Sequence, residues 1–369
     1  MNRRNFLNIL GGGTILAAAG SAGFLFSRTP TKALEPWAGA TTYTDPIKRA
    51  LAHALLAPNP HNRQPWLVDL SQEGQVTIHR DTTRDLPMTD PLNRQIFIGM
   101  GCFLETLRLA ATETGHVVDF DILPQGEDGP IAVAKFSKGA TLDPLAEFIV
   151  TRHSDKQAYE DRDIEADKIA ALSNYVSIIT DQQRVEALRQ ITWDALEIEM
   201  LTPHTLKESV DLMRIGKREI NATPDGIEMR EPMLDALYNL GLLKREMLLD
   251  TDHSGFRAKM NAMQRTCFAT PAFAVLTTQG NTRHDQINAQ ISAGRDWMRY
   301  SLAATSIGLG TQPMSQALQE YPEVATQYDQ VHQMLAQDGE TVQMLARVGY
   351  GSHAIATPRW ALETRIVNG

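Results

Sequence analysis

The chain has 369 residues, of which 43% are hydrophobic and 21% charged, and its formal net charge is -9. This length predicts roughly two domains, and the hydrophobic content is sufficient for substantial cores in a soluble protein. The acidic balance argues against a nucleic-acid-binding protein, which would carry a basic stripe. The two cysteines, Cys102 and Cys267, form no Cys-x-x-Cys, and the ten histidines include no His-Glu-x-x-His. A metal site is therefore not expected, whereas a disulfide between the two cysteines stays open.

The N-terminus has the composition of a targeting segment. Residues 1–33 contain four cations and no acid, and Arg3-Arg4-Asn5-Phe6-Leu7 precedes an apolar run over residues 9–26. This order is typical of a signal peptide, and paired arginines before Phe-Leu are typical of the twin-arginine export route. We expect residues 1–33 to be a twin-arginine signal peptide, the export machinery to be a partner, and the protein to be periplasmic or otherwise exported. A plain secretory signal or an N-terminal anchor helix is the alternative.

The first half of the chain, residues 45–140, predicts the order helix, strand, strand, helix, strand, strand. Asp45-Pro46 and Asp90-Pro91 are typical helix starts, and Gly115 is expected to end the second helix. Period-2 patterns predict strands at 67–70, 75–79, 117–123 and 131–136. Between the first helix and the first strand, Ala57–Trp66 has three prolines in eight residues, which exclude a helix or a central strand. This stiff loop presents polar side chains, at Asn59, His61, Asn62 and Gln64.

The second half, residues 145–369, is expected to begin with a helical segment over 142–150 and a helix over 164–175. A largely helical insertion over 184–264 follows. Its methionines belong either to a hydrophobic core or to an adaptable cover over a ligand. We then expect a central strand at 272–278, a long helix at 285–307, an extended segment at 311–316 and a last strand at 342–349. The two halves together predict an α+β fold.

A charged stretch, Arg152-His153-Ser154-Asp155-Lys156, joins the two halves. Arg152 offers a fork of donors, Lys156 a point charge and Ser154 a hydroxyl, which together suit an anion such as phosphate. A solvated charged turn is the alternative interpretation.

Four motifs resemble those of the nitroreductase family of FMN oxidoreductases. Ala57-Pro58-Asn59-Pro60-His61-Asn62-Arg63-Gln64-Pro65-Trp66 resembles the family's Asn-x-Gln-Pro-Trp loop, and Arg152-His153-Ser154-Asp155-Lys156 resembles its Arg-x-Ser-x-Arg/Lys. Ala303–Thr311 resembles the family's helix end Ala-Ala-x-x-x-Gly-Leu-Gly-Thr, and Arg347–Gly351 with Pro358-Arg359 resembles its C-terminal strand and phosphate-binding arginine. The resemblance covers residues 45–365.

The order of the motifs differs from that of an ordinary member, in which the Arg-x-Ser motif comes first. Ordinary members are homodimers that build each flavin site from both subunits. This chain looks like two such subunits fused, with the loop in the first half and the other motifs in the second, as in the tandem Acg-like subgroup. The resemblance therefore implies a nitroreductase-like fold, a monomer with an internal pseudo-dimer, and one FMN per chain.

The resemblance also implies a set of cofactor-binding residues. Arg152 and Arg359 would neutralise the FMN phosphate with Ser154, and Lys156 would lie near flavin N1 and O2. The backbone N–H groups of the segment after the long helix would face flavin N5 and O4. The stiff loop would line the opposite side of the flavin. The remaining members are His153, Gln64 and Arg94, of which Arg94 is equally well a helix-surface arginine. The full cofactor-binding set comprises Arg152, His153, Ser154, Lys156, Asn59, Pro60, Asn62, Gln64, Arg94, Met314, Ser315, Gln316 and Arg359. No side chain is expected to act as a catalytic acid or base.

Three functions are compatible with these motifs. The first is an exported FMN oxidoreductase that reduces a small acceptor, such as a quinone or a nitro compound, with the flavin carrying the redox chemistry. The second is an FMN-binding or flavin-sequestering protein without reductase turnover. The third is a fused-repeat structural protein without flavin. Neither the electron donor nor the acceptor is identified by the sequence.

Overall fold

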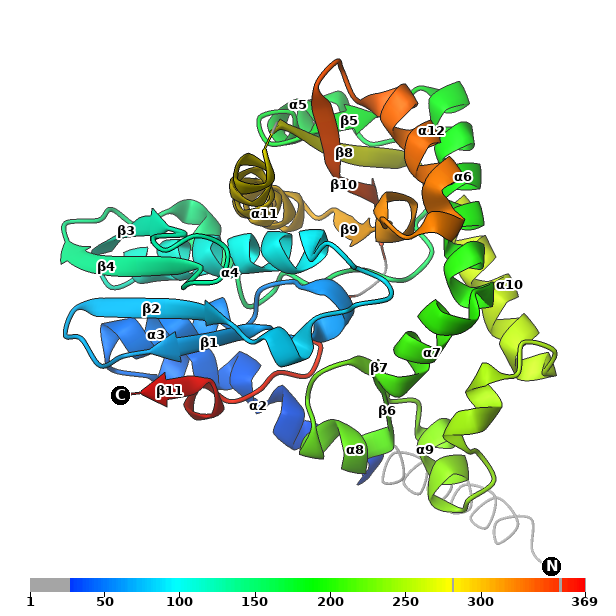
Figure 1. Ribbon diagram of the computed structural model, residues 1–369, viewed down its shortest axis with the longest axis horizontal. Helices are drawn as coiled ribbons and strands as arrows, with labels where there is room; N and C mark the ends of the chain where they lie inside the picture. Colours follow the sequence, from blue (N-terminus) through cyan, green and yellow to red (C-terminus); the bar gives the residue numbers. More distant parts are fainter. Residues whose placement is uncertain (1–26, 281, 352–353, 369) are drawn as a thin grey trace, which may run out of the picture.

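The computed structural model describes residues 27–280, 282–351 and 354–368 (Figure 1). The paired arginines and the apolar run of the expected signal peptide lie outside the described residues. The described chain forms an α+β fold, as the sequence predicted, with two main sheets and a small two-stranded sheet. Among the residues described, no helix is long and apolar enough to cross a membrane.

The first sheet has the strand order β11-β1-β2-β4-β3, and the second has the order β5-β8-β10-β9. Within these two sheets, all neighbouring strands are antiparallel except the β11–β1 pair. The strands of the first sheet are β1 (Trp66–Asp69), β2 (Gln75–Arg80), β3 (His116–Ile122), β4 (Ala132–Lys138) and β11 (Ile366–Asn368). Those of the second are β5 (Ser177–Ile179), β8 (Ala272–Gln279), β9 (Gly310–Pro313) and β10 (Glu340–Gly349).

The two halves of the chain repeat one order of elements. The first half runs α3, β1, β2, α4, β3, β4, and the second runs α5, β5, β8, α11, β9, β10, apart from insertions. Corresponding strands also occupy corresponding places in the two sheets. The helices concerned are α3 (Pro46–Ala54), α4 (Arg94–Thr112), α5 (Ala166–Leu172) and α11 (Arg283–Ser306).

Helices α4 and α11 pack against each other in the middle of the molecule, with β5 and β8 of the second sheet above α11 in Figure 1 and the first sheet below it. Two glycines make this contact, and it is symmetric. A Cβ atom on Gly101 would lie 2.0 Å from the Ile291 carbonyl oxygen, and a Cβ atom on Gly294 would lie 2.0 Å from the Ile98 carbonyl oxygen. Each of these oxygens belongs to the residue three positions before the opposing glycine. The contact is thus reciprocal between α4 and α11.

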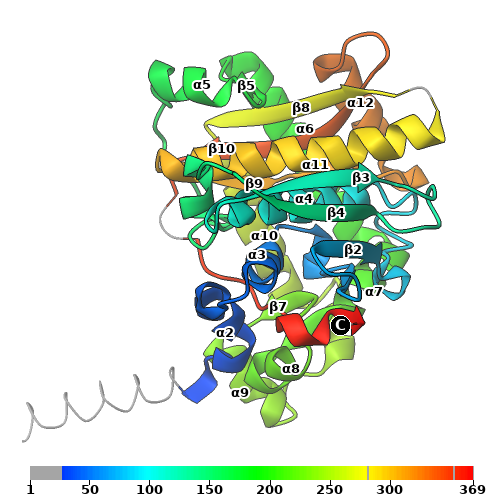
Figure 2. The ribbon, with the colours of Figure 1, turned by 90° about the vertical axis from the view of Figure 1, so that its left-hand side faces the viewer.

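The insertion between β5 and β8 forms a separate helical layer along one side of the molecule (Figures 1 and 2). It was expected to be largely helical, yet it also contains two short parallel strands, β6 (Met213–Ile215) and β7 (Ile227–Met229). Its helices are α6 (Gln182–Leu201), α7 (Pro203–Asp211), α8 (Gly216–Ala222), α9 (Pro232–Asn239) and α10 (Ser254–Phe268). Helix α12 (Ala325–Leu335), from between β9 and β10, packs on α6.

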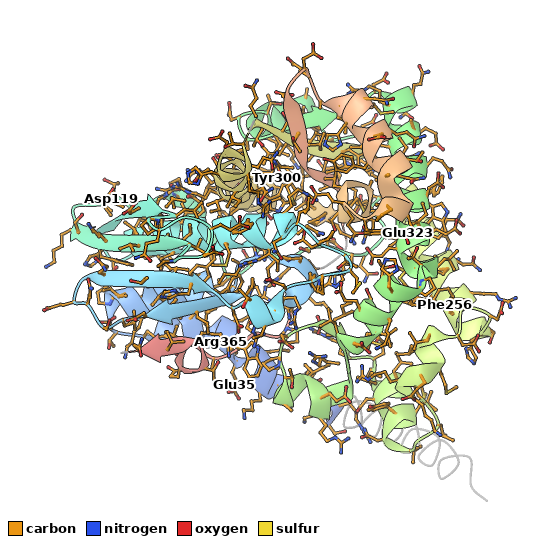
Figure 3. The ribbon with its side chains drawn as sticks, viewed as in Figure 1. Glu35, Asp119, Phe256, Tyr300, Glu323 and Arg365 are labelled. Atoms are coloured by element: carbon orange, nitrogen blue, oxygen red, sulfur yellow. The ribbon has the colours of Figure 1, made fainter. Side chains whose placement is uncertain are left out.

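The buried side chains form two main clusters, one between the repeated halves and one under the insertion. Tyr300 of α11 belongs to the first cluster and is completely buried, and it is labelled near the centre of Figure 3. Phe256 and Glu323 lie toward the insertion side of the same view. The site described below lies where elements of both halves meet the insertion.

The start of α4 differs from the expectation. Asp90-Pro91 does not open the helix, which begins at Arg94 after Asn93 in a left-handed conformation, with φ of 57°. Asp90 still caps the helix, since its two carboxylate oxygens accept from the Gln95 and Ile96 N–H groups at 3.1 and 3.0 Å. A turn is thus interposed between the capping residue and the helix.

Several other boundaries also differ from the expectations. The 142–150 segment is a 3-10 helix, η4 (Pro144–Phe148), and the 311–316 segment changes after β9 into the 3-10 helix η6 (Ser315–Leu318). The strand at 342–349 is not the last, because β11 follows it and pairs with β1 in the first sheet. Helix α2 (Thr31–Gly39) begins inside the expected signal segment, and its Ala33 is buried. Cleavage after residue 33 would cut this helix.

Candidate anion-binding site

Two arginines from distant parts of the chain meet at one backbone carbonyl. Arg152 follows η4, and Arg359 lies in the extended tail after β10. Arg152 Nη2 donates to the Leu56 carbonyl oxygen at 3.5 Å, and Arg359 Nη2 donates to the same oxygen at 3.2 Å. Each arginine is only 3% exposed. The fold therefore brings together the two arginines assigned to one anion.

No carboxylate of the described residues forms an ion pair with either guanidinium, and the Nε of each is buried without a hydrogen-bond partner among them. Burial lowers the pKa of Arg152 to about 10. Burial, followed by repulsion from Arg152, lowers the pKa of Arg359 to about 9. Two adjacent buried cations without a counter-ion oppose folding. A phosphate dianion would neutralise both and accept from their unused N–H groups.

An aromatic wall lies beside the two arginines. The Trp37 ring of α2 meets the His153 ring edge-on at 4.5 Å between centroids, and the Arg359 guanidinium carbon lies 5.4 Å from the Trp37 ring centroid. Trp37 Nε1 donates to the Thr357 carbonyl oxygen at 2.7 Å, which ties α2 to the tail. Burial lowers the pKa of His153 to about 4, and the nearby arginines add to this effect. The imidazole is therefore neutral at pH 7, with one N–H to donate.

The loop before β1 has an unusual backbone. His61, Asn62 and Gln64 have φ values of 46°, 52° and 50°, in the left-handed region. Each such non-glycine residue costs on the order of 1 kcal/mol, and such conformations concentrate at functional loops. The Asn59 carboxamide oxygen stabilises the loop by accepting from the Gln64 N–H at 2.7 Å. The three prolines thus produce the stiff loop that the sequence predicted, with a 3-10 turn, η2 (Pro60–Asn62), inside it.

The loop rests on α4 through a glycine. A Cβ atom on Gly99 would lie 3.1 Å from the Asn59 Cβ and 3.3 Å from the Pro60 Cδ, so a larger residue would push the loop away. His61 follows, and its Nδ1 is buried without a partner among the described residues. Burial lowers the pKa of His61 to about 4, and the charges of Arg63 and Lys156 lower it further.

Two residues of this loop bind other loops of the protein. The Asn62 carboxamide oxygen accepts from Arg359 Nη1, and its Nδ2 donates to the Pro358 carbonyl oxygen at 3.0 Å. Gln64 is fully buried; its Nε2 donates to the Pro224 carbonyl oxygen at 2.6 Å and its Oε1 accepts from the Trp360 N–H at 2.9 Å. Asn62 therefore orients Arg359, whereas Gln64 joins the loop to the tail and the insertion.

Residues 224–230 of the insertion, here called the covering segment, lie over this loop. Gly226 donates its N–H to the Asn62 carbonyl oxygen at 3.2 Å, and Arg230 Nη2 donates to the Ala356 carbonyl oxygen at 2.5 Å. Arg230 also pairs with Glu228. The Glu228 carboxylate favours the charged form of Arg359, although the two form no ion pair. The covering segment therefore brings one acidic group close to the cation pair.

The Arg152 stretch is anchored to the second sheet. Asp155 donates its N–H to the Thr311 carbonyl oxygen at 3.1 Å, and Arg347 Nη2 donates to the Gln157 carbonyl oxygen at 2.6 Å. Ser154 is half-buried, and Lys156 is exposed. Four motifs that are far apart in the sequence, namely 57–66, 152–156, 303–311 and 347–359, thus converge.

The segment after α11 is only partly available to a ligand. Met314 is buried and donates its N–H to the Leu345 carbonyl oxygen at 2.8 Å, so this N–H is already used. Ser315 and Gln316 open η6, where the first N–H groups have no partner within the helix.

Arg94 does not join the cation pair. It is 1% exposed, its Nη1 and Nη2 donate to the Gln343 and Leu318 carbonyl oxygens at 2.6 and 2.8 Å, and its Nε lies 3.8 Å from the Glu320 carboxylate. Arg94 is therefore not a surface arginine, and it connects α4 to the second half of the chain.

Sequence reasoning missed several groups at the site. No recognisable motif includes Trp37, the Leu56 carbonyl or Glu228. Trp37 also lies just after residues 1–33, which are expected to be a signal peptide. A short Glu-Pro-Trp sequence carries no chemical signal; only the packing of α2 against the tail reveals its role.

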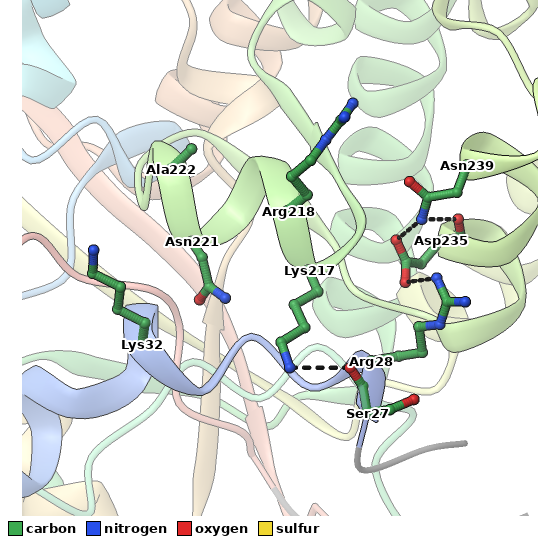
Figure 4. A pocket seen from close by; sticks show the side chains of 9 residues that line it. All are labelled: Ser27, Arg28, Lys32, Lys217, Arg218, Asn221, Ala222, Asp235 and Asn239. Atoms are coloured by element: carbon green, nitrogen blue, oxygen red, sulfur yellow. Dashed lines mark hydrogen bonds and ion pairs between the residues drawn. The ribbon is translucent and has the colours of Figure 1, made fainter. Parts of the chain in front are cut away.

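Two cavities lie beside α2, and the first of them reaches Arg359 of the site. One, of about 330 Å³, is lined by residues of α2, α3 and the tail, including Leu55, Arg359 and Trp360. The other, of about 680 Å³, lies between α2 and the α8–α9 region (Figure 4). In it Asp235 pairs with Arg28, and Lys217 donates to the Ser27 carbonyl oxygen. Within the described ranges, no group of three or more His, Cys, Asp or Glu residues could hold a metal ion, and both cysteines are buried and unpaired.

Part of the chain is similar in sequence to mycobacterial proteins. It is 33% identical over 85 residues to the Acg protein of Mycobacterium tuberculosis, whose name assigns it provisionally to the NAD(P)H nitroreductases; the alignment covers 23% of this chain and 25% of Acg. It is 34% identical over 95 residues to an uncharacterized protein of the same organism, covering 25% and 28% of the two chains. The chain thus matches about a quarter of the length of these relatives. No family model matches the chain.

Solved nitroreductase structures align with a larger part of the chain at low identity. The FMN-dependent nitroreductase NfnB of Mycobacterium smegmatis, in complex with NADPH, is 17% identical and covers 60% of this chain and 96% of its own, with a TM-score of 0.37. A nitroreductase with bound FMN from Desulfitobacterium hafniense is 11% identical, covers 62% and 100%, and has a TM-score of 0.37.

Proposed function

We propose that this protein is an exported FMN-binding oxidoreductase of the nitroreductase type that reduces a small acceptor through the flavin. The observation that carries the proposal is the cation pair of Arg152 and Arg359, which is buried, lacks an ion-pair partner among the described residues and is built from two distant motifs. FMN ends in a phosphate dianion, which supplies the negative charge and the acceptor oxygens that the two guanidinium groups require. The sequence similarity to Acg and the four nitroreductase-like motifs support the same assignment.

The residues around the cation pair have separate roles in this proposal. Arg152 and Arg359 bind the phosphate, Asn62 orients Arg359 through its carboxamide oxygen, and Ser154 adds a hydroxyl. Neutral His153 donates one N–H without adding charge, and Trp37 excludes water from that side. Bound FMN supplies the two-electron chemistry, and the protein supplies binding, orientation and electrostatics.

Lys156 is exposed, and its charge acts on His61 of the stiff loop and on Glu228 of the covering segment. A cation there would stabilise negative charge that develops on a reduced flavin ring. We assign Lys156 this role and assign the walls of the ring site to Asn59 and Pro60, on the side of α4.

We further propose that the chain is a monomeric pseudo-dimer, in which residues 45–140 and 145–369 take the places of two subunits. The repeated order of elements and the symmetric contact of Gly101 and Gly294 support this arrangement. The sequence contains one Arg-x-Ser-x-Arg/Lys motif, at 152–156, and one Asn-x-Gln-Pro-Trp-like loop, so we expect one site per chain.

Purified protein should therefore release close to one FMN per chain when it is denatured. The measurement is the absorbance of the released flavin against protein concentration, with the nucleotide identified by chromatography. A ratio near two would contradict the fused-subunit interpretation, and a protein that neither carries nor takes up FMN would overturn the proposed function.

A flavin-sequestering protein without turnover is the second candidate, and the covering segment favours it. Its hydrogen bonds to Asn62, Gln64 and Ala356 close the insertion over the loop, which would restrict access of an acceptor. The two candidates differ in one observation, namely whether chemically reduced bound flavin is reoxidised rapidly by a quinone or a nitroaromatic compound under anaerobic conditions.

Export in the folded state is a separate expectation. The cation pair joins residues about 200 positions apart, so the proposed FMN site exists only in the folded chain. Replacing Arg3 and Arg4 together by lysine should retain FMN-loaded protein in the cytoplasm without reducing its flavin content, because the twin-arginine route reads the arginine pair. Cell fractionation with flavin analysis tests this expectation. Undiminished export of the double-lysine variant would show that the arginines act only as an ordinary basic n-region.

A further inference from the structure

The first described residues of the chain, 27–33, are bound into the folded body. Arg28 Nη1 pairs with the Asp235 carboxylate of α9 at 2.9 Å, and the Asp235 side chain is only 3% exposed. The Ala33 carbonyl oxygen accepts from the Arg359 N–H at 2.8 Å. Removal of this segment would leave a buried carboxylate without its cation, which is strongly unfavourable, and the Arg359 N–H without its acceptor. The contacts therefore argue against cleavage after residue 33.

The apolar run that precedes this segment is long for a cleaved signal. Residues 9–26 contain no charged side chain. The run is longer than the roughly 7–15 apolar residues of a secretory signal and matches the roughly 17–25 residues that span a membrane. It lies outside the described residues and continues directly into the bound segment. A cut that keeps the bound segment intact must therefore fall inside the run or before it.

The three most exposed large apolar side chains of the described residues lie on α9 or directly after it. Met233 of α9 is 65% exposed, and Leu240 and Leu242 of the turn after it are 72% and 65% exposed. Asp235 of the same helix pairs with Arg28, so α9 contacts the segment that enters the fold. Figures 1 and 2 both show α8, α9 and the start of α2 at one end of the molecule. Exposed apolar side chains that gather in one place commonly mark an interaction surface.

The cavity between α2 and the α8–α9 region, at the same end, is positively charged (Figure 4). Its lining includes the cations Arg28, Lys32, Lys217 and Arg218 and one carboxylate, that of Asp235. Arg28 already neutralises Asp235, and no ion pair among the described residues involves the other three cations. The chain as a whole has a net charge of -9, so this positive charge is a local feature. The phosphate groups of a phospholipid bilayer would complement it.

We propose that residues 9–26 stay attached as a membrane anchor, and that the end of the molecule formed by α2, α8 and α9 rests on the phospholipid bilayer. The apolar turn after α9 enters the membrane interface, and the cations of the cavity face lipid phosphates. Two exposed carboxylates at this end, Glu35 and Glu231, do not line the cavity. No flavin takes part, so this arrangement holds or fails independently of the proposed FMN chemistry.

Cell fractionation tests the anchor. The full chain carries a removable C-terminal tag and is produced in a bacterium that has the twin-arginine machinery. We expect the protein in the membrane fraction, released by detergent but not by high salt, with an intact mass near 40.9 kDa after removal of the tag. A chain that has lost part or all of residues 9–26, or that is recovered in the soluble fraction, would overturn the anchor.

Fluorescent labels on the full chain test whether this end of the molecule contacts lipid. Leu240→Cys places a label on the apolar turn, and Val117→Cys, on β3 far from α9 in Figure 1, is the matched control; both native cysteines are buried. In vesicles that contain phosphatidylglycerol, brominated lipid should quench the label at position 240 and leave the label at position 117 unchanged. No quenching at either position would show that the body only hangs from its anchor and would overturn the docking. Energy transfer between labels at position 240, without quenching by lipid, would assign the surface to a second copy of the chain.

Removing two exposed cations tests the contribution of charge. Lys32→Gln combined with Arg218→Gln should lower the ratio of quenched to unquenched label at position 240 by about fivefold for each cation removed. Lys135→Gln combined with Lys138→Gln, at exposed positions on β4, removes the same charge elsewhere and should leave the ratio unchanged. Equal ratios in the two double variants would overturn the contact between the cavity cations and lipid phosphates. Flavin content, measured on the same samples, reports separately on the proposed function.

Discussion

Replacing Arg152 by methionine should yield a folded protein that no longer retains FMN. The change removes one of two cations that would face a buried phosphate dianion, and truncating one partner of such a buried pair costs about 2–5 kcal/mol. Flavin affinity should therefore fall by roughly 30-fold to several thousand-fold, at 1.4 kcal/mol per factor of ten. Equilibrium dialysis with free FMN measures the loss. Arg152→Lys keeps the charge but loses the fork of donors, so its affinity should be intermediate.

The same variant should change stability in the opposite direction when flavin is absent. Burial lowers the pKa of Arg152 from 12.5 to about 10, so the charged side chain opposes folding at every pH below 10, by about 3 kcal/mol. Flavin-free Arg152→Met should melt at a higher temperature than the flavin-free wild type, and added FMN should reverse the order. Arg257→Met, at a side chain that is 65% exposed, should change neither property. Wild-type flavin content in Arg152→Met would show that the stretch is only a charged turn.

Replacing Gly101 by alanine should strongly destabilise the protein. Alanine favours a helix over glycine by about 1 kcal/mol. Its Cβ atom, however, would lie 2.0 Å from the Ile291 carbonyl oxygen and 2.9 Å from the Gly294 Cα, which are backbone atoms that cannot rotate away. Helices α4 and α11 must separate, and overpacking of this kind costs on the order of 3 kcal/mol or more. A lower thermal midpoint, measured by circular dichroism, should result.

The Gly101 variant should also weaken flavin binding, since α4 supports the stiff loop and α11 leads into the segment before η6. Gly39→Ala is the matched control, because a Cβ atom at the end of α2 would meet no heavy atom within 4 Å. Wild-type stability in Gly101→Ala would contradict the close packing of the two helices.

The sequence by itself determined the α+β class, the long helices and the residues of the cation pair. Local signals were sufficient for these features. The Asp45 carboxylate accepts from the Lys48 N–H at the start of α3, as the Asp-Pro pair predicted. The prolines of 57–66 excluded a helix, and the alternation of apolar and polar residues located β2 and β4. Arg152 and Arg359 belong to motifs that are recognisable without a structure.

The tertiary structure decided which polar groups serve the site and which serve the fold. Strand β11 has three residues and no clear pattern, and only its pairing with β1 defines it. Arg94 resembles a surface arginine until the Gln343 and Leu318 carbonyls approach it. Glu199 occupies an ordinary helical position, and the packing of η6 against α6 removes its carboxyl from water. Burial and charge interactions depend on neighbours that are distant in the sequence, which is why the pKa values of these groups arise only in the folded chain.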